Sequence, residues 1–205
     1  MLADKTVKEF LQETASSAPV PGGGSVAALS AGLAAALTAM VANLTIGKKG
    51  YEGLEEEMER IAKEAEQYRD KFIEYIDKDS ESFNQVMAAF KLPKETEEEK
   101  EIRKEMIQRS YKTAALVPLE VARNGLKIMD IIEIVVVKGN KNAVTDGAVA
   151  AMMARTATLS ALYNVKINLG SIKDTEFVEK VSKEVVEIEE KVVKVEKEIL
   201  GKVAL

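Results

Sequence analysis

The sequence predicts an all-α protein, folded as one single-domain bundle of about six helices over residues 1–205. Three observations support this fold class. Apolar residues recur at steps of three and four along most of the chain, which is the period of a helix packed on one side. Capping boxes at Thr6–Glu9 and Thr96–Glu99 mark two helix starts. A chain of 205 residues without internal repeats or a long linker suits one domain with a buried core.

The N-terminal half contains three expected helices. The first begins at the Thr6 capping box. The second is expected over about residues 25–46, where a stripe of large apolar residues has Ala, Gly, Ser and Thr behind it, so we predict a long buried helix packed on its small face. The third is expected over about residues 53–90 and ends before Pro93.

The second helix lies in a stretch, residues 18–47, that has no charged residue and is long enough to cross a bilayer. Its many small residues favour close packing against other helices over contact with lipid. The N-terminus lacks the basic start and apolar run of a secretion signal. We therefore expect a cytoplasmic protein without membrane contact, and a membrane helix is the less favoured alternative.

The C-terminal half contains the remaining helices. The fourth begins at Thr96, and Pro118 should kink or interrupt it. The segment IMDIIEIVVV has strong β propensity but keeps the helical period, so we predict a helix there. After the turn KGNKN, a helix of small residues is expected over about residues 143–167. The last helix carries a heptad seam and should pack along a partner helix, in this subunit or the next. The seam residues are Val178, Val181, Val185, Ile188, Val192, Val195 and Ile199.

The composition excludes several kinds of chemistry. The chain has no cysteine and no histidine, which rules out disulfides and cysteine nucleophiles and disfavours zinc catalysis. Proton transfer near neutral pH must then use Asp, Glu, Lys or Tyr with a shifted pKa. The net charge of −5 argues against a nucleic-acid partner. We expect neither a metal nor a cofactor.

The triplet Gly22–Gly24 follows Pro21 and leads into the second helix. No strand precedes it and it lacks the lysine of a phosphate-binding loop, so neither nucleotide-binding motif fits. Free amides at a helix start bind anions or carbonyl oxygens, and glycine lets a ligand approach the backbone. A tight structural turn is an equally good explanation.

An acid, Asp79, occupies a core-facing step of the third helix, between Ile76 and Phe83. A buried carboxyl either pairs with a cation or has a raised pKa, and a raised pKa suits a general acid or base. The alternative is a structural ion pair with Arg or Lys from a facing helix. Asp77 lies on another face and is expected to be solvated.

Further polar residues flank two helix ends. Asn140, Asn142 and Asp146 surround the start of the small-residue helix, where capping explains one of them but not all three. Asn164 and Asn168, one turn apart near its end, either cap it or hydrogen-bond a heterocycle.

The loop after the second helix contains Lys48 and Lys49, with Tyr51 beside them. These lysines are either solvated or placed to hold a carboxylate tail.

Several motifs occur together and in order: PVPGGGSVAALSAGLAAALTAMVANLTIGKKGYE, DKDSESF, KLPKETEEE, VPLEVA, GNKNAVTDGAVAA and NVKINL. They resemble the formiminotetrahydrofolate cyclodeaminase family and the related methenyltetrahydrofolate cyclohydrolases, over about residues 19–169. The resemblance implies an all-helical homodimer with a folate substrate. Well-known members carry a formiminotransferase domain ahead of the deaminase, which we expect this chain to lack, and Thr145 stands where a serine is expected.

The activity implied by the resemblance is cyclodeamination of 5-formimino-tetrahydrofolate to 5,10-methenyl-tetrahydrofolate and ammonia. Asp79 is then the expected acid–base residue, and Asp146 stabilises cationic charge or holds the pterin. The glycine amides and Ser25 would bind substrate, the asparagines would orient the ring, and the lysines would meet the glutamate tail. The expected substrate-binding residues are Pro21, Gly22, Gly23, Gly24, Ser25, Asn43, Lys48, Lys49, Tyr51, Asn140 and Asn142. Alternatives are cyclohydrolase activity and a non-catalytic helical assembly protein.

Overall fold

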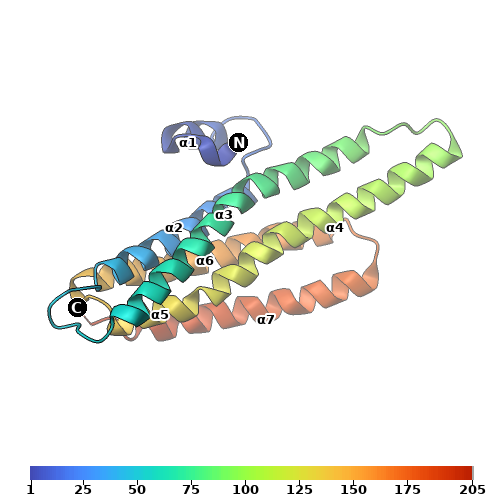
Figure 1. Cartoon of the computed structure of the whole chain (residues 1–205). Helices are drawn as coiled ribbons and strands as arrows, with labels where there is room; N and C mark the ends of the chain where they lie inside the picture. Colours follow the sequence, from blue (N-terminus) through green and yellow to red (C-terminus); the bar gives the residue numbers. More distant parts are fainter. Residues whose placement is uncertain (205) are drawn as a thin grey trace.

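The computed structural model describes residues 1–204, which form helices and loops without a strand. The α-helices are α1 (Val7–Thr14), α2 (Gly23–Asn43), α3 (Glu55–Phe90), α4 (Glu97–Lys127), α5 (Met129–Lys138), α6 (Val144–Leu169) and α7 (Thr175–Leu200). Short 3₁₀ helices, η1 (Leu2–Asp4) and η2 (Lys141–Ala143), precede α1 and α6. Helices α2–α7 make the expected bundle, and α1 lies on its outside (Figure 1).

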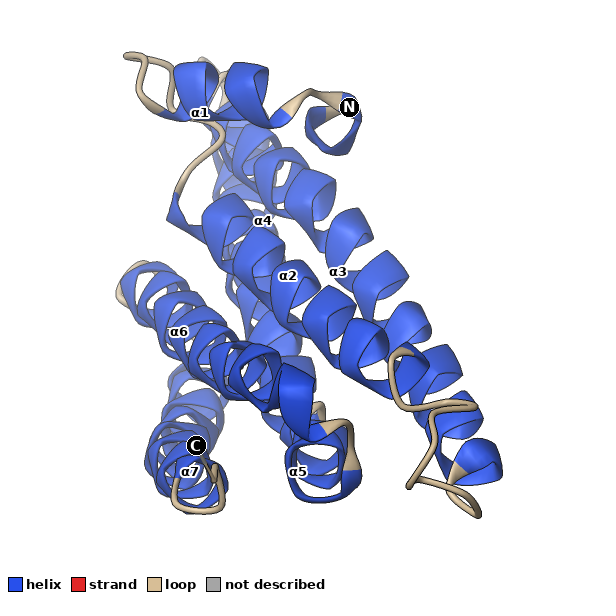
Figure 2. Cartoon of the chain, turned by 90° about the vertical axis from the view of Figure 1, so that its left-hand side faces the viewer, coloured by secondary structure: helices blue, strands red, loops and turns tan. Residues whose placement is uncertain are grey.

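The long helices α2, α3, α4 and α6 form a closed array in which each packs against two of the others (Figure 2). Helices α2 and α6 run antiparallel, because Gly23 at the start of α2 lies near Asn164 of α6 and the turn after α2 lies near Asn140. The core of the array contains many small residues. This composition lets the helix axes approach closely.

The predicted packing of α2 is confirmed. Its small residues are buried against the neighbouring helices, whereas Val26 and Leu33 are 37% and 48% exposed. The helix is long and apolar enough to cross a membrane, and 56% of its most apolar window is buried inside the bundle.

Of the two outcomes predicted at Pro118, a kink or an interruption, the interruption is wrong, because one helix runs from Glu97 to Lys127. Proline cannot donate the hydrogen bond that would reach the carbonyl four residues earlier, at Ala114. The side-chain amide of Asn168 on α6 donates to that carbonyl instead, at 2.9 Å. A residue 50 positions away therefore supplies the donor that the proline lacks.

The heptad seam of α7 packs within the same subunit, mainly against α6. Val181, Val185, Ile188 and Val192 are all buried there. Because the seam is covered, it offers no assembly surface, which removes the basis of the assembly-protein alternative.

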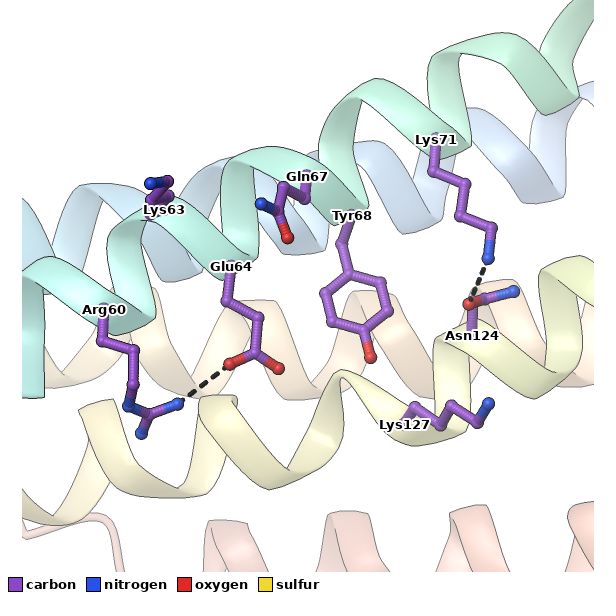
Figure 3. Close-up of a pocket in the computed structure, with 8 residues that line it drawn as sticks. All are labelled: Arg60, Lys63, Glu64, Gln67, Tyr68, Lys71, Asn124 and Lys127. Atoms are coloured by element: carbon purple, nitrogen blue, oxygen red, sulfur yellow. Dashed lines mark hydrogen bonds and ion pairs between the residues drawn. The ribbon is translucent and has the colours of Figure 1, made fainter.

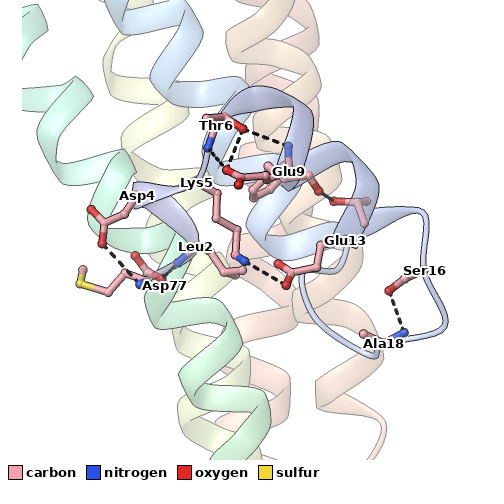
Figure 4. A network of polar contacts seen from close by, with 12 residues as sticks. Leu2, Asp4, Lys5, Thr6, Glu9, Glu13, Ser16, Ala18 and Asp77 are labelled. Carbon is pink, nitrogen blue, oxygen red and sulfur yellow. Dashed lines mark hydrogen bonds and ion pairs between the residues drawn. The ribbon is translucent and has the colours of Figure 1, made fainter.

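The expectation that Asp77 is solvated is wrong. The side chain is 8% exposed and accepts hydrogen bonds from the backbone N–H groups of Leu2, at 2.5 Å, and Ala3, at 3.4 Å (Figure 4). Asp77 thereby attaches the N-terminal segment to α3, and that segment covers it. The predicted capping box of Thr6 and Glu9 is confirmed in the same view.

Candidate active site

The carboxyl group of Asp79 on α3 lies against the first turn of α2. Ser25 Oγ is 3.0 Å from Asp79 Oδ2 and donates to it, and this serine is fully buried. Ser25 Oγ also lies 3.0 Å from the carbonyl oxygen of Ile76, so its single proton is shared between two acceptors. The bond joins α2 to α3 and fixes the orientation of the carboxyl group.

Gly24 makes this approach possible. A Cβ atom added at Gly24 would lie 1.9 Å from Asp79 Oδ1, far inside van der Waals contact. Gly22, the N-cap residue of α2, supplies no side-chain hydrogen bond to the helix. The bare backbone of the glycine triplet therefore gives an acid from α3 access to the start of α2.

Two opposing effects set the pKa of Asp79. Burial raises the pKa above its ordinary value of 3.8, and hydrogen bonds from the side chain and backbone of Ser25 counteract the rise. No cationic residue contributes to the shift, so the expected alternative of a structural ion pair lacks support. A carboxyl group with a raised pKa keeps its proton closer to neutral pH and serves as an acid or a base.

A hollow of about 350 Å³ opens beside Asp79. One side consists of the glycine triplet and the carboxyl group. The other is an apolar wall from α3 and α4, formed by Phe83, Val86, Met87, Phe90 and Tyr111. The rings of Phe90 and Tyr111 meet edge to face, with centroids 6.2 Å apart. This shape suits a flat aromatic ligand with one polar edge.

Asn164 and Asn168 on α6 also line the hollow. The amide nitrogen of Asn164 donates to the carbonyl of Ser160, and that of Asn168 donates to Ala114 and Asn164. Within residues 1–204 neither amide oxygen accepts a hydrogen bond from another residue. The hollow therefore offers acceptors to the N–H groups of a heterocycle.

The structure separates the sequence-predicted site residues into two groups. Pro21, the glycine triplet, Ser25 and Asp79 gather at the start of α2. The other group lies at the end of α2 and the start of α6, about 30 Å along the helix from Gly24. Its members are Asn43, Lys48, Lys49, Tyr51, Asn140, Asn142 and Asp146.

Two members of this distant group have structural partners. Asn140 caps η2: its side chain accepts from the N–H of Asn142 and donates to the carbonyl of Leu44. The hydroxyl group of Tyr51 accepts from the N–H of Lys141 at 2.8 Å. Among the described residues, by contrast, Lys48 has no ion-pair partner and the carboxyl group of Asp146 accepts no hydrogen bond.

The apolar wall was missed as a site feature from sequence, because Phe83, Met87 and Phe90 fit the core stripe of α3. Met87 and Phe90 are each 43% exposed, so that face of α3 is only partly covered. No sequence signal singles out Tyr111, since its position depends on how α4 packs against α3.

A larger hollow of about 600 Å³ lies between α3 and α4 (Figure 3). Arg60, Lys63, Lys71 and Lys127 make it basic. Arg60 pairs with Glu64 on its own helix, at 3.0 Å. The carboxyl group of Glu64, which lines this hollow, is held in that ion pair, so the hollow beside Asp79 is the better candidate for proton transfer.

The shifted pKa of Asp79 predicts a pH-dependent stability. In the folded chain the carboxyl group holds its proton to higher pH than in the unfolded chain, where its pKa is near 3.8. Wild-type protein should therefore lose stability relative to Asp79→Asn as the pH rises from about 3.8 to the raised pKa, and the difference should be constant above it. Thermal midpoints of both proteins across this range measure the effect. A difference that is constant across the range would show that the pKa is not raised.

Fold and site together define an all-α enzyme with a hollow beside a partly buried carboxyl group. The chain belongs to the formiminotransferase-cyclodeaminase family, whose model matches residues 6–187. It is 42% identical to the methenyltetrahydrofolate cyclohydrolase of Methylorubrum extorquens, over 90% of this chain and 88% of that protein. It is 36% identical to the formimidoyltransferase-cyclodeaminase of Gallus gallus, over 86% of this chain but only 32% of that longer protein.

A solved structure has the same fold. The formiminotetrahydrofolate cyclodeaminase of Thermotoga maritima superposes with a TM-score of 0.88 at 34% identity, over 99% of this chain and 98% of that one.

Proposed function

We propose that this chain is a formiminotetrahydrofolate cyclodeaminase, which converts 5-formimino-tetrahydrofolate to 5,10-methenyl-tetrahydrofolate and ammonia. The observation that carries the proposal is the Asp79 carboxyl group, whose pKa is raised by burial and which opens onto a hollow with an apolar wall. The full-length similarity to a cyclodeaminase of the same fold supports it.

The reaction requires two proton transfers and tolerance of positive charge. Folate N10 attacks the carbon of the protonated formimino group on N5 and gives up its own proton to a base, which leaves a neutral tetrahedral intermediate with an amino group. Protonation of the former imino nitrogen lets ammonia leave, and the lone pair of the bridging nitrogens forms the cationic methenyl bridge. One carboxyl group that alternates between its protonated and ionised forms serves both transfers.

Asp79 is assigned this role. In its protonated form it supplies the proton that makes ammonia a good leaving group. Once ionised, it stabilises the positive charge of the methenyl bridge, an effect strengthened by the partly buried setting. Ser25 holds the carboxyl group by its hydrogen bond, and the apolar wall is assigned to the aromatic part of the substrate.

The second candidate is methenyltetrahydrofolate cyclohydrolase, favoured by the 42% identity along nearly the whole of such an enzyme. In that reaction water adds to the methenyl carbon and loses one proton to a base, which gives a hydroxyl-bearing bridge. The bond to N5 then breaks as N5 is protonated and the hydroxyl group loses its proton to become the formyl oxygen, so one proton is released overall. The product is 10-formyl-tetrahydrofolate. Asp79 can act in this sequence too, because it again needs one group that accepts and then donates a proton.

Following the near-ultraviolet absorbance of the methenyl product separates the two candidates. With 5-formimino-tetrahydrofolate, we expect the methenyl chromophore to grow only when enzyme is present. A flat trace, together with enzyme-dependent loss of the chromophore from added methenyl-tetrahydrofolate, would establish the cyclohydrolase instead. Enzyme-free samples correct for spontaneous hydrolysis. If the enzyme accelerates the reaction of neither substrate, both candidates are contradicted.

A further inference from the structure

The side-chain amide of Asn168, near the end of α6, uses both of its hydrogens. Its nitrogen donates to the carbonyl of Ala114 on α4, at 2.9 Å, and to the carbonyl of Asn164 one turn back, at 2.8 Å. An amide nitrogen has two hydrogens and accepts no hydrogen bond, so it has nothing left to offer a ligand. The amide oxygen, by contrast, accepts no hydrogen bond within residues 1–204 and is not buried. Because Asn168 lines the hollow beside Asp79, this oxygen is an acceptor available to a ligand there.

The two carbonyl groups fix which way the amide lies. A turned-over amide would place its oxygen 2.9 Å from the oxygen of Ala114, where the two acceptors repel each other. Pro118 strengthens this constraint, because it has no N–H to give to the same carbonyl. Pro118 is buried and does not line the hollow, so it influences a ligand there only through Asn168.

Asn164, the other amide in the hollow, is not fixed in this way. Its nitrogen donates to the carbonyl of Ser160, at 2.9 Å, and no other carbonyl within residues 1–204 takes its second hydrogen. The group lies against the backbone of Gly23, where an added Cβ would come within 3.3 Å of the amide nitrogen. Asn164 can therefore offer a donor or an acceptor, whereas Asn168 offers an acceptor alone.

An acceptor held in one orientation discriminates between ligands. It binds a ring edge that presents an N–H group and repels an edge that presents only lone pairs. The pterin ring of a folate presents N–H groups on its pyrimidine edge, and a flat ring fits against the apolar wall of α3 and α4. The fixed amide of Asn168 therefore matches the edge of the ring, while the wall matches its face.

We propose that Asn168 binds an N–H group of the pterin ring, and that Pro118 is the positioning residue that fixes its amide. The hollow then rejects heterocycles whose corresponding edge carries only acceptors. The choice of the pterin rests on the proposed function, whereas the fixed orientation of the amide does not.

A double variant separates the binding role of Asn168 from its structural role. Asn168→Leu alone removes the acceptor but also leaves the carbonyl of Ala114 without a donor, so it should lower the thermal midpoint by several degrees. Pro118→Ala supplies a backbone N–H for that carbonyl. In the Pro118→Ala background, Asn168→Leu should therefore leave the midpoint unchanged and remove the acceptor alone, because leucine keeps the branched shape of the side chain.

Calorimetric titration with 5-formyl-tetrahydrofolate, whose pterin has these N–H groups, measures the binding role. Pro118→Ala should weaken binding by about twofold to fivefold, because the amide is then free to turn. The double variant should bind about tenfold more weakly than Pro118→Ala, at an unchanged thermal midpoint. A purely structural Asn168 would move the midpoint of the single variant but would not produce this difference in affinity.

Each part of the proposal has a result that contradicts it. Equal affinity of the double variant and Pro118→Ala would overturn the contact with Asn168. Wild-type affinity in Pro118→Ala would overturn the positioning role of Pro118. Absence of binding by the wild-type chain would overturn the assignment to the pterin. A wild-type chain that binds the compound but converts neither folate would count against the proposed function alone, since the differences in affinity still decide the contact.

Discussion

Asp79→Asn is expected to lower kcat by about a hundredfold to ten-thousandfold, the usual contribution of a general acid–base residue. Asparagine has nearly the same shape and its amide oxygen still accepts the hydrogen bond from Ser25. It neither gives up nor takes up a proton at neutral pH, so the chemistry is lost while the contact between α2 and α3 remains. Initial rates with saturating 5-formimino-tetrahydrofolate measure the effect, and circular dichroism reports the fold.

Asp77→Asn is the matched control for this experiment. It makes the same change two residues away on the same helix, but its carboxyl group binds the backbone of Leu2 and does not line the hollow beside Asp79. Its kcat should stay within about twofold of wild type, even if the attachment of the N-terminal segment weakens. Retention of near-normal kcat by Asp79→Asn would show instead that this residue is structural.

Gly24→Ala is expected to remove activity almost as completely, although it adds only one methyl group. The new Cβ would stand 1.9 Å from Asp79 Oδ1, so the carboxyl group must leave its place or α2 must shift. Either response breaks the hydrogen bond to Ser25 and misplaces the acid. A misplacement of about 1 Å is enough to cost about a hundredfold in rate.

Gly32→Ala is the matched control, since it makes the same substitution two turns further along α2. Its Cβ would meet Phe72 Cβ at 3.8 Å, an ordinary contact, so activity and stability should be retained. The double variant Gly24→Ala/Asp79→Asn tests the cause. If the methyl group acts through Asp79, the double variant should be no slower than Asp79→Asn alone. Additive losses would point to a separate effect of Gly24 on the fold.

Local signals in the sequence predicted the elements of the fold well. The capping boxes at Thr6 and Thr96 begin α1 and α4 as expected, because cap and partner are only three residues apart. The period of apolar residues assigned the β-prone segment after Lys127 correctly to a helix, α5. Both signals depend on a few neighbouring residues, so no knowledge of the tertiary structure is needed.

The errors arose where a distant residue decides the outcome. Pro118 is tolerated because Asn168 supplies a hydrogen bond, and Asp77 is buried because the N-terminal segment folds back onto it. The inward orientation of the Asp79 side chain was predictable, because the residue falls in the row of apolar residues along α3. Its contact with Gly24 was not, since that contact depends on the register between α2 and α3. For the same reason, spacing along the chain did not reveal that Asp79 and Asp146 lie at opposite ends of one subunit.

The hydrogen bond from Asn168 to Ala114 has a consequence for the order in which this chain tolerates substitutions at two distant positions. Any other residue at position 118 would restore a backbone donor for the carbonyl of Ala114, and the amide at position 168 would no longer be needed there. While the proline is present, loss of that amide leaves a carbonyl group without its partner. Substitutions at the two positions are therefore expected to be non-additive, and their order matters: position 118 can change first, whereas a change at position 168 leaves the carbonyl of Ala114 without a donor for as long as the proline remains.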